Sequence, residues 1–289
     1  MDESQTKTVL ITGASTGIGY ECASRMSKLG WKVYAGVRKE SDGKRVEEEL
    51  GKNVKAVLLD VTKPADVSAF KNTLADSGQR LDGLLNNAGI AIGGPVEVLS
   101  VEEYRRSFDV NFFGQIRLIQ ELLPFLRESK GRIVNMSSLA GKLSQPMMSA
   151  YCSSKHALEA LSDSLRMELA VFDVKVIVIE PGAIKTPIWD KGSASAKSLS
   201  ESIEGKVSMT AKAKELYQKQ LRAIEKAIHV AGKNGVPASM VADALEKALT
   251  ADRPKTRYKV GRDSKLGILA KTWLSDKAMD KAILKNFSM

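Results

Sequence analysis

The sequence has few of the residues that mark a disulfide-linked, metal-binding or membrane-spanning protein. Among 289 residues there are only two cysteines, Cys22 and Cys152, and two histidines, His156 and His229. Two cysteines provide no disulfide framework and fit a reducing compartment, so we expect a cytoplasmic protein. The histidines are isolated, and we expect no metal site. No apolar run reaches the length of a membrane span, and none near the N-terminus resembles a secretory signal.

Basic residues outnumber acidic ones, and almost all of the excess lies in one part of the chain. The formal net charge is +10, of which residues 190–289 contribute +9 and residues 1–189 contribute +1. A solvated basic surface explains this excess, and so does an anionic partner of the C-terminal part. A nucleic acid is not the expected partner, because the chain has no zinc-finger, RNP-like aromatic or recognition-helix pattern.

Seven short apolar runs predict β-strands, and they alternate with helical segments through residue 180. The runs are continuously apolar, which is typical of a parallel sheet covered by helices on both faces. We therefore expect an α/β fold of the Rossmann type, doubly wound around a seven-stranded parallel sheet, in a single domain spanning residues 1–289. The expected strands are 8–12, 32–37, 54–61, 81–85, 132–136, 174–179 and 257–260.

The first expected strand leads into a glycine-rich turn, residues 13–19, and then into a helix. Glycine lets backbone N–H groups approach a pyrophosphate, and the helix N-terminus adds partial positive charge. The spacing is Gly-x-x-x-Gly-x-Gly rather than the more common Gly-x-Gly-x-x-Gly, but the context of strand, turn and helix predicts a phosphate cradle. Ligands of such a sheet bind at the carboxyl ends of its strands. The residues at these ends include Gly13, Arg38, Asp60, Asn86, Ser138 and Pro181.

The end of the second expected strand indicates which dinucleotide is preferred. An acidic residue there would bind the 2′-hydroxyl of NAD, but the chain has Val37 followed by Arg38. An arginine at this place pairs with the 2′-phosphate of NADP, so we expect NADP(H) to be preferred, with NAD(H) possible. The alternative is a solvent-facing basic turn. Asp60, at the end of the third strand, is expected to hydrogen-bond the adenine amino group.

Tyr151 and Lys155 are the candidate proton-transfer pair. On a helix, residues four apart lie on one face, one turn from each other. An ammonium beside a phenol favours the phenolate, so we expect the pKa of Tyr151 to lie below its reference value. The pair alone is also common on exposed helices. Ser149 is expected to cap this helix, which spans residues 149–172, and a second long helix is expected over residues 100–128.

The C-terminal third contains the expected substrate cover. No strand is expected between Pro187 and Pro237, and a helical lid is expected over residues 187–235, with a loop at 232–235. Within the lid, an amphipathic helix near 212–229 has basic residues between its apolar ones. The residues of its apolar face are Ala213, Leu216, Tyr217, Leu221, Ile224, Ala227 and Ile228. A lid that closes over substrate is favoured over contact with an anionic membrane, and residues 262–289 are expected to form short helices.

Six motifs in order carry a family resemblance. They are Thr12-Gly13-Ala14-Ser15-Thr16-Gly17-Ile18-Gly19, Asn86-Asn87-Ala88-Gly89, Asn111, Ser138, Tyr151-x-x-x-Lys155, and Pro181-Gly182 followed by Thr186. With them the chain resembles the classical short-chain dehydrogenases/reductases, most strongly over residues 7–187. The segment 253–261 looks similar to the branch that contains 17β-hydroxysteroid and retinol dehydrogenases.

The resemblance implies four catalytic residues. Tyr151 would be the general acid/base, and Lys155 would lower its pKa and hold the nicotinamide ribose. Ser138 would orient the substrate oxygen, and Asn111 would hold a water that continues the proton relay. The cofactor residues it implies, together with those argued above, are Gly13, Ser15, Thr16, Gly17, Ile18, Gly19, Arg38, Asp60, Val61, Asn87, Ala88, Gly89, Tyr151, Lys155, Pro181, Gly182, Ile184 and Thr186.

The sequence therefore predicts an oxidoreductase that interconverts an apolar carbonyl compound and its alcohol, with a steroid-, retinoid- or lipid-like substrate. The alternative is a dinucleotide-binding regulatory protein without catalytic activity, which would not need the four polar residues. Members of the family commonly pair their two long helices across a two-fold axis. We therefore expect a homodimer or a homotetramer.

Overall fold

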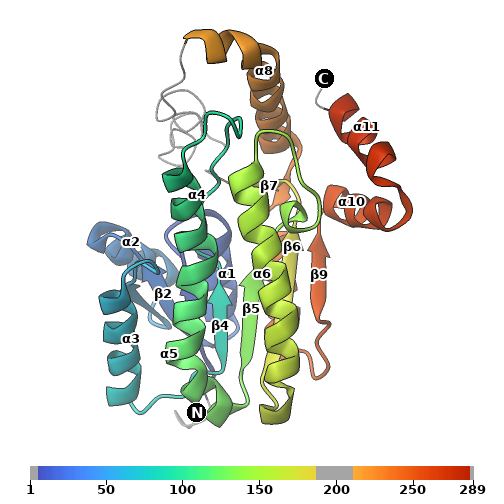
Figure 1. Cartoon of the computed structure of the whole chain (residues 1–289). Helices are drawn as coiled ribbons and strands as arrows, with labels where there is room; N and C mark the ends of the chain where they lie inside the picture. The colour runs from blue at the N-terminus through green and yellow to red at the C-terminus, as the bar shows by residue number, and fades with distance from the viewer. Residues whose placement is uncertain (1–5, 187–210, 287–289) are drawn as a thin grey trace.

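The computed structural model describes residues 6–186 and 211–286. Its main sheet has seven parallel strands in the order β3-β2-β1-β4-β5-β6-β9, and Figure 1 shows helices on both sides of it. The strand order changes direction between β1 and β4, which is the switch point where ligands bind in this architecture. The strands are β1 (Thr8–Thr12), β2 (Lys32–Val37), β3 (Val54–Leu58), β4 (Gly83–Asn86), β5 (Arg132–Met136), β6 (Lys175–Pro181) and β9 (Arg257–Val260).

The expected fold class and the seven strands are confirmed, but three strands have other bounds than expected: β4 begins at Gly83 and not at residue 81, β6 runs to Pro181, and β3 is shorter. The third strand was expected to reach residue 61, but β3 ends at Leu58. Asp60 and Val61 therefore lie in the loop that follows the strand. Neither residue takes part in the β2–β3 pairing. The Asp60 side chain is held within the loop, where its Oδ1 accepts hydrogen bonds from the N–H and the hydroxyl of Thr62.

Two apolar layers hold the helices onto the sheet. Val9, Ile11 and Leu85 point toward one face, and their neighbours Leu10 and Leu84 point toward the other, as strand alternation requires. The first face is covered by α1 (Gly17–Lys28), α2 (Glu40–Leu50) and α9 (Ser239–Thr250). The second face is covered by α3 (Pro64–Asp76), α5 (Gly114–Ser129) and α6 (Ser149–Glu168), which lie in front of the sheet in Figure 1.

The helix expected over residues 100–128 is interrupted. Helix α4 (Val101–Phe108) passes into a π-helical turn, Asp109–Phe113, before α5 begins at Gly114. Ser100 caps α4 by accepting a hydrogen bond from the Glu103 N–H. The π-turn contains Asn111, the residue whose position inside a helix needed explanation. Such turns are rare and occur frequently at functional sites.

The helix that carries Tyr151 begins where expected but is not capped by Ser149. Met148 occupies the N-cap of α6 without a side-chain hydrogen bond. The Ser149 hydroxyl lies 2.5 Å from the Tyr104 hydroxyl of α4 and is used in that contact. The helix ends at Glu168, and residues Ala170–Phe172 form a separate 3₁₀ turn.

The substrate-side elements differ from expectation in two places. Helix α8 (Ala211–Asn234) continues through most of the expected loop at 232–235. A short strand β8 (Val236–Pro237) pairs in parallel with β7 (Ile184–Lys185), although no strand was expected there. Residues 187–210, the first half of the expected lid, lie outside the described residues. Figure 1 shows α8 beyond the carboxyl edge of the sheet.

The apolar face expected on α8 is buried only in part. Ile224 is buried, but Leu216 is 60% exposed. The two C-terminal helices, α10 (Arg262–Trp273) and α11 (Asp276–Asn286), agree with the expected short helical pieces. Across residues 6–186 and 211–286, no helix is both long enough and apolar enough to cross a membrane.

Gly114, at the start of α5, is expected to tolerate no side chain. A Cβ atom there would lie 2.7 Å from Val61 Cγ2 and 2.9 Å from the Val61 carbonyl oxygen. Gly114→Ala should therefore lower the free energy of unfolding by about 1–3 kcal/mol, the usual cost of overpacking. Urea denaturation measures it. Gln120→Ala, at an exposed position of the same helix, should change it by less than about 0.5 kcal/mol; equal values for the two variants would contradict the prediction.

Candidate active site

The turn between β1 and α1 is built from glycine because the backbone folds back on itself. Gly13 and Gly17 have positive φ angles of 64° and 58°, a region that glycine adopts at no steric cost. A Cβ atom on Gly19 would lie 2.2 Å from the Gly13 carbonyl oxygen. The first N–H groups of α1, which have no partner within the helix, follow directly at Gly17. The turn thus has the geometry of an anion cradle.

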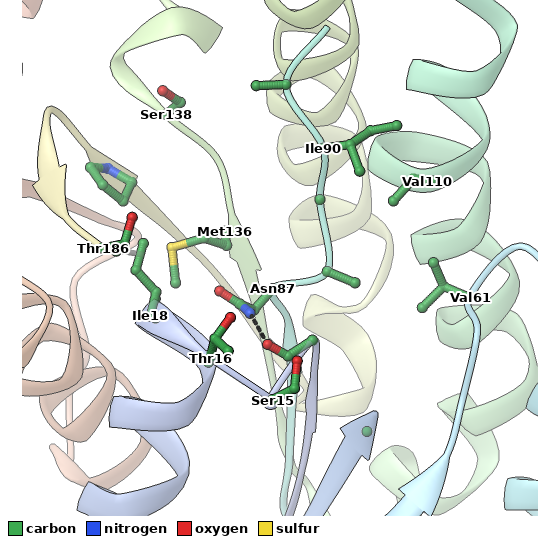
Figure 2. Close-up of a pocket in the computed structure, with 18 of the residues that line it drawn as sticks. Ser15, Thr16, Ile18, Val61, Asn87, Ile90, Val110, Met136, Ser138 and Thr186 are labelled. Carbon is green, nitrogen blue, oxygen red and sulfur yellow. Dashed lines mark hydrogen bonds between the residues drawn. The ribbon is translucent and has the colours of Figure 1, made fainter. Parts of the chain in front are cut away.

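The loop after β4 fixes this turn in place. Asn87 Nδ2 donates to the carbonyl oxygens of Thr12, at 2.8 Å, and Gly13, at 3.2 Å. The Thr12 hydroxyl accepts from the backbone N–H groups of Asn87 and Ala88 at 3.0 and 2.9 Å. Figure 2 shows the Asn87 side chain directed at the glycine-rich turn. The two loops at the switch point are therefore one hydrogen-bonded unit.

A cavity of about 310 Å³ lies at the carboxyl ends of the strands. All eighteen residues predicted to bind a cofactor line it. Ser138 lines it too, and Figure 2 shows this residue with Thr186 and several residues of the glycine-rich turn. The cavity therefore reaches from the glycine-rich turn and Arg38 to Ser138 and Tyr151. Sequence reasoning missed the other lining residues, which are Gly36, Val37, Leu59, Ile90, Ala91, Val110, Met136 and Ser137. Most are small or apolar, and in a sequence such residues cannot be told from core residues.

Two groups define the polar chemistry at the β2 end of the cavity. Burial opposes ionisation of Asp60, but hydrogen bonds from Thr62 and the charge of Arg38 outweigh it, so the Asp60 pKa is lowered. Arg45, from α2, donates to the Ser15 carbonyl oxygen at 2.6 Å. Its guanidinium therefore lies beside the glycine-rich turn. The sequence did not predict this contact, because Arg45 is one of several charged residues in an exposed helix.

At the other end, α6 presents Tyr151 and Lys155 toward Ser138. The Lys155 ammonium lies 5.8 Å from the centroid of the Tyr151 ring and donates to the Met136 carbonyl oxygen at 2.7 Å. The Ser138 hydroxyl accepts from the Ala140 N–H at 3.1 Å. Ser138 also hydrogen-bonds the Tyr151 side chain. The expected proximity of these three residues is thus present.

The protonation of this pair differs from the expectation of a lowered tyrosine pKa. Burial raises the Tyr151 pKa, and the hydrogen bond with Ser138 offsets only part of the rise. Burial also lowers the pKa of Lys155 to about 8, against a smaller opposing effect of Glu159. Loss of water around both groups therefore outweighs the attraction that was expected to dominate.

Asn111 lies beneath the cavity rather than in its lining. Its side chain is fully buried and binds both ends of one peptide unit: Nδ2 donates to the Ile90 carbonyl oxygen at 2.9 Å, and Oδ1 accepts from the Ile90 N–H at 2.8 Å. Nδ2 also donates to the Ser154 hydroxyl at 3.0 Å. A Cβ atom on Gly89 would lie 3.3 Å from Asn111 Oδ1 and 3.7 Å from Lys155 Nζ. Gly89 thus lies between the two side chains.

Comparison with known proteins agrees with this arrangement. Residues 7–197 match the family model described as short chain dehydrogenase. The chain belongs to the short-chain dehydrogenase family. It is therefore an NAD(P)-dependent oxidoreductase with a Rossmann-like fold, as the resemblance of its motifs implied.

Individual relatives cover nearly the whole chain. An NADPH-dependent 3-dehydrocapnine reductase from Ornithobacterium rhinotracheale is 34% identical over 284 residues, which are 96% of each protein. Retinol dehydrogenase 7 from Mus musculus is 36% identical over 278 residues, 93% of this chain and 85% of that protein. The crystal structure of a short-chain dehydrogenase from Streptomyces avermitilis superposes with a TM-score of 0.79 at 28% identity, covering 98% and 96% of the two chains.

The lowered pKa of Lys155 makes a prediction about stability. The group titrates near pH 8 in the folded protein and near 10.5 when unfolded, so between these values the unfolded state binds more protons. Stability gained from this residue must then rise with pH across that window. The free energy of unfolding of the wild type minus that of Lys155→Met should increase by up to about 3 kcal/mol from pH 8 to 10.5. Urea titrations at several pH values measure it, and a constant difference would contradict it.

Proposed function

We propose that the protein is an NADP(H)-preferring oxidoreductase that interconverts an apolar ketone or aldehyde and the corresponding alcohol. The observation that carries the proposal is the convergence of Ser138, Tyr151 and Lys155 at one end of a cavity whose other end is the glycine-rich turn. A protein that only bound a dinucleotide would gain nothing from a buried lysine beside a tyrosine, because burial of a charge costs free energy.

The residues of the cavity fit a dinucleotide. The N–H groups at the start of α1 would bind the pyrophosphate, because Gly17, Ile18 and Gly19 line the cavity at the positive end of that helix. Asp60 would accept from the adenine amino group. Arg38 would pair with a 2′-phosphate, and Arg45 would add positive charge from its place beside Ser15 of the glycine-rich turn. Thr186, Ile184 and the turn at Pro181 and Gly182 would hold the nicotinamide. One relative, the 3-dehydrocapnine reductase, is named as NADPH-dependent, which supports the same preference.

When bound, the cofactor supplies the hydride, and the chain supplies the proton and the orientation. Tyr151 donates its phenolic proton to the substrate oxygen as that oxygen gains negative charge. Ser138 donates a hydrogen bond to the same oxygen and holds it next to the phenol. Lys155 stabilises the phenolate left on Tyr151. Asn111 would hold the water through which the proton relay continues from Lys155. The raised pKa of Tyr151 keeps the phenol protonated before the step.

The substrate surface is apolar. Ile90, Ala91 and Met136 line the cavity, and Ala91 also contacts Ile224 of α8. This contact supports the view of α8 as a cover that excludes water from the reacting carbonyl. The relatives named for retinol and 3-dehydrocapnine support a carbonyl or alcohol on a long apolar molecule.

Tyr151→Phe removes only the ionisable oxygen from a ring that otherwise packs unchanged. Reduction of a panel of apolar ketones with NADPH should therefore fall by roughly 10²–10⁴-fold, while NADPH binding measured by fluorescence stays near the wild-type value. Retention of more than about a tenth of the wild-type rate would exclude Tyr151 as the general acid.

The cofactor preference is tested at the end of β2. Val37→Asp combined with Arg38→Leu removes a phosphate partner and adds an acceptor for a 2′-hydroxyl, so kcat/KM should shift from NADPH toward NADH. Arg38→Leu alone should lower kcat/KM with NADPH without raising kcat/KM with NADH. Wild-type protein that uses NADH as well as or better than NADPH would refute the assignment of Arg38.

We also propose that two copies pair through the outer faces of the helices that follow β4 and β5. Large apolar side chains are exposed there: Phe113 is 49% exposed at the end of the π-turn, and Met167 on α6 is 68% exposed. The Phe113 ring also packs against the Phe112 ring, with 5.2 Å between the two ring centroids. An exposed apolar surface of this kind is typical of an interface.

Phe113→Asp should therefore shift the mass measured by sedimentation from that of a dimer or tetramer toward the monomer, because it buries a charge in the interface. Leu29→Asp, which changes an equally exposed leucine near the opposite face of the sheet, should leave the assembly intact. A wild-type protein that is monomeric at every concentration would show the proposed interface to be wrong.

A further inference from the structure

A group of charged residues, among them two buried glutamates, lies where β6 meets β9. Arg257 of β9 is its centre and forms ion pairs with Glu159, with Glu180 at 3.1 Å and with Asp163 at 2.7 Å. The Glu180 side chain is fully buried, and that of Glu159 is 5% exposed. Burial and the neighbouring Glu159 raise the Glu180 pKa, and Arg257 opposes the rise. None of these residues lines the cavity.

The two buried glutamates belong to elements that carry the active site. Glu159 is one helical turn beyond Lys155 on α6 and two turns beyond Tyr151, so all three lie along one face of the helix. Glu180 is in β6 directly before Pro181, which lines the cavity. Arg257 therefore joins the catalytic helix to the strand that leads into the expected nicotinamide turn.

Lys142 connects a fourth element, the 3₁₀ turn that precedes it, to this group. Its ammonium lies 2.8 Å from Glu159 Oε2 and 3.9 Å from Glu180 Oε1. Lys142 follows the short 3₁₀ turn Leu139–Gly141, which begins directly after Ser138. The Gly141 N–H donates to the Ser138 carbonyl oxygen at 2.9 Å. The turn is thus held to Ser138 at its beginning and to Glu159, through Lys142, at its end.

The turn also lies directly against α6. A Cβ atom on Gly141 would be 3.1 Å from Glu159 Cγ, 3.1 Å from the Lys155 carbonyl oxygen and 2.7 Å from Ser137 Oγ. Such spacing leaves no room for the turn to move closer to the helix. The ion pair opposes movement away from it, so the turn is confined in both directions.

We propose that Lys142 is a positioning residue, whose ion pair with Glu159 holds the 3₁₀ turn against α6 and keeps the Ser138 hydroxyl aligned with Tyr151. The inference rests on the proposed function in that the aligned hydroxyls act on a carbonyl substrate. Lys142 is suited to a test because its side chain is 27% exposed and its removal leaves Glu159 paired with Arg257. The buried glutamate then keeps a partner, and the fold is preserved.

The first measurement separates turnover from binding. A misplacement of about 1 Å in a catalytic group can cost as much as 10²-fold in rate, so Lys142→Met should lower kcat for carbonyl reduction about tenfold. The KM for NADPH and the Tm should stay near the wild-type values, and Lys142→Arg should restore most of kcat. Lys175→Met is the matched control. It removes a lysine that pairs with Asp173 at 2.7 Å on the exposed surface, and it should leave kcat unchanged.

The second measurement does not depend on turnover. Hydrogen–deuterium exchange of the peptide covering residues 137–143 should be faster in Lys142→Met than in the wild type or Lys142→Arg, because the Ala140 and Gly141 N–H groups are bound within this turn. If no ketone is reduced by the wild type, the proposed function fails while this exchange result still decides whether Lys142 holds the turn.

Three results would overturn the positioning role. One is unchanged exchange in Lys142→Met. Another is a loss of kcat that Lys142→Arg does not restore. The third is a fall in Tm and NADPH affinity in proportion to kcat, which would mean that the ion pair supports the fold in general.

Discussion

The close approach of the backbone at the β1–α1 turn is the constraint on which the cavity depends. The Gly19 α-carbon lies so near the Gly13 carbonyl that any side chain there would overlap it. This contact aims the start of α1 at the strand ends, and the Asn87 amide then joins the turn to the loop after β4. Because β1 and β4 are the strands at which the sheet order changes direction, the joined loops form the floor of the cavity.

The catalytic end is organised by polar anchors rather than by close-packed backbone. Lys155 binds the Met136 carbonyl and so joins α6 to β5, while Asn111 binds both groups of the Ile90 peptide. Each anchor buries a polar or charged group, which is costly unless the group is fully bonded. The lowered pKa of Lys155 reflects that cost. The charges around Arg257 extend the same arrangement to β6 and β9.

Most of the fold could be predicted because its signals are local. Apolar runs of strand length and the glycine turn located all seven strands and the cradle, since hydrophobicity and turn chemistry are properties of neighbouring residues. The place of Asn111 in a π-turn could not be predicted, because the partner of its side chain, the Ile90 peptide, is 21 residues away in the chain. Ser149 has a good capping side chain, but Tyr104 of another helix engages its hydroxyl. The loop predicted at residues 232–235 was wrong for most of its length, because α8 continues to Asn234. Glycine favours a loop, but this local preference does not by itself decide where a helix ends.

The sequence by itself determined the family, the order of the strands along the chain and the residue types of the site, because motif spacing within each strand–turn–helix unit records them directly. Only the tertiary structure decided how those residues behave. The pKa of Tyr151 is raised and not lowered, Asn111 lies under the cavity instead of in its lining, and Lys142 reaches the catalytic helix through Glu159. Desolvation and ion pairing depend on which distant segments meet, and that information is absent from the local pattern of residues.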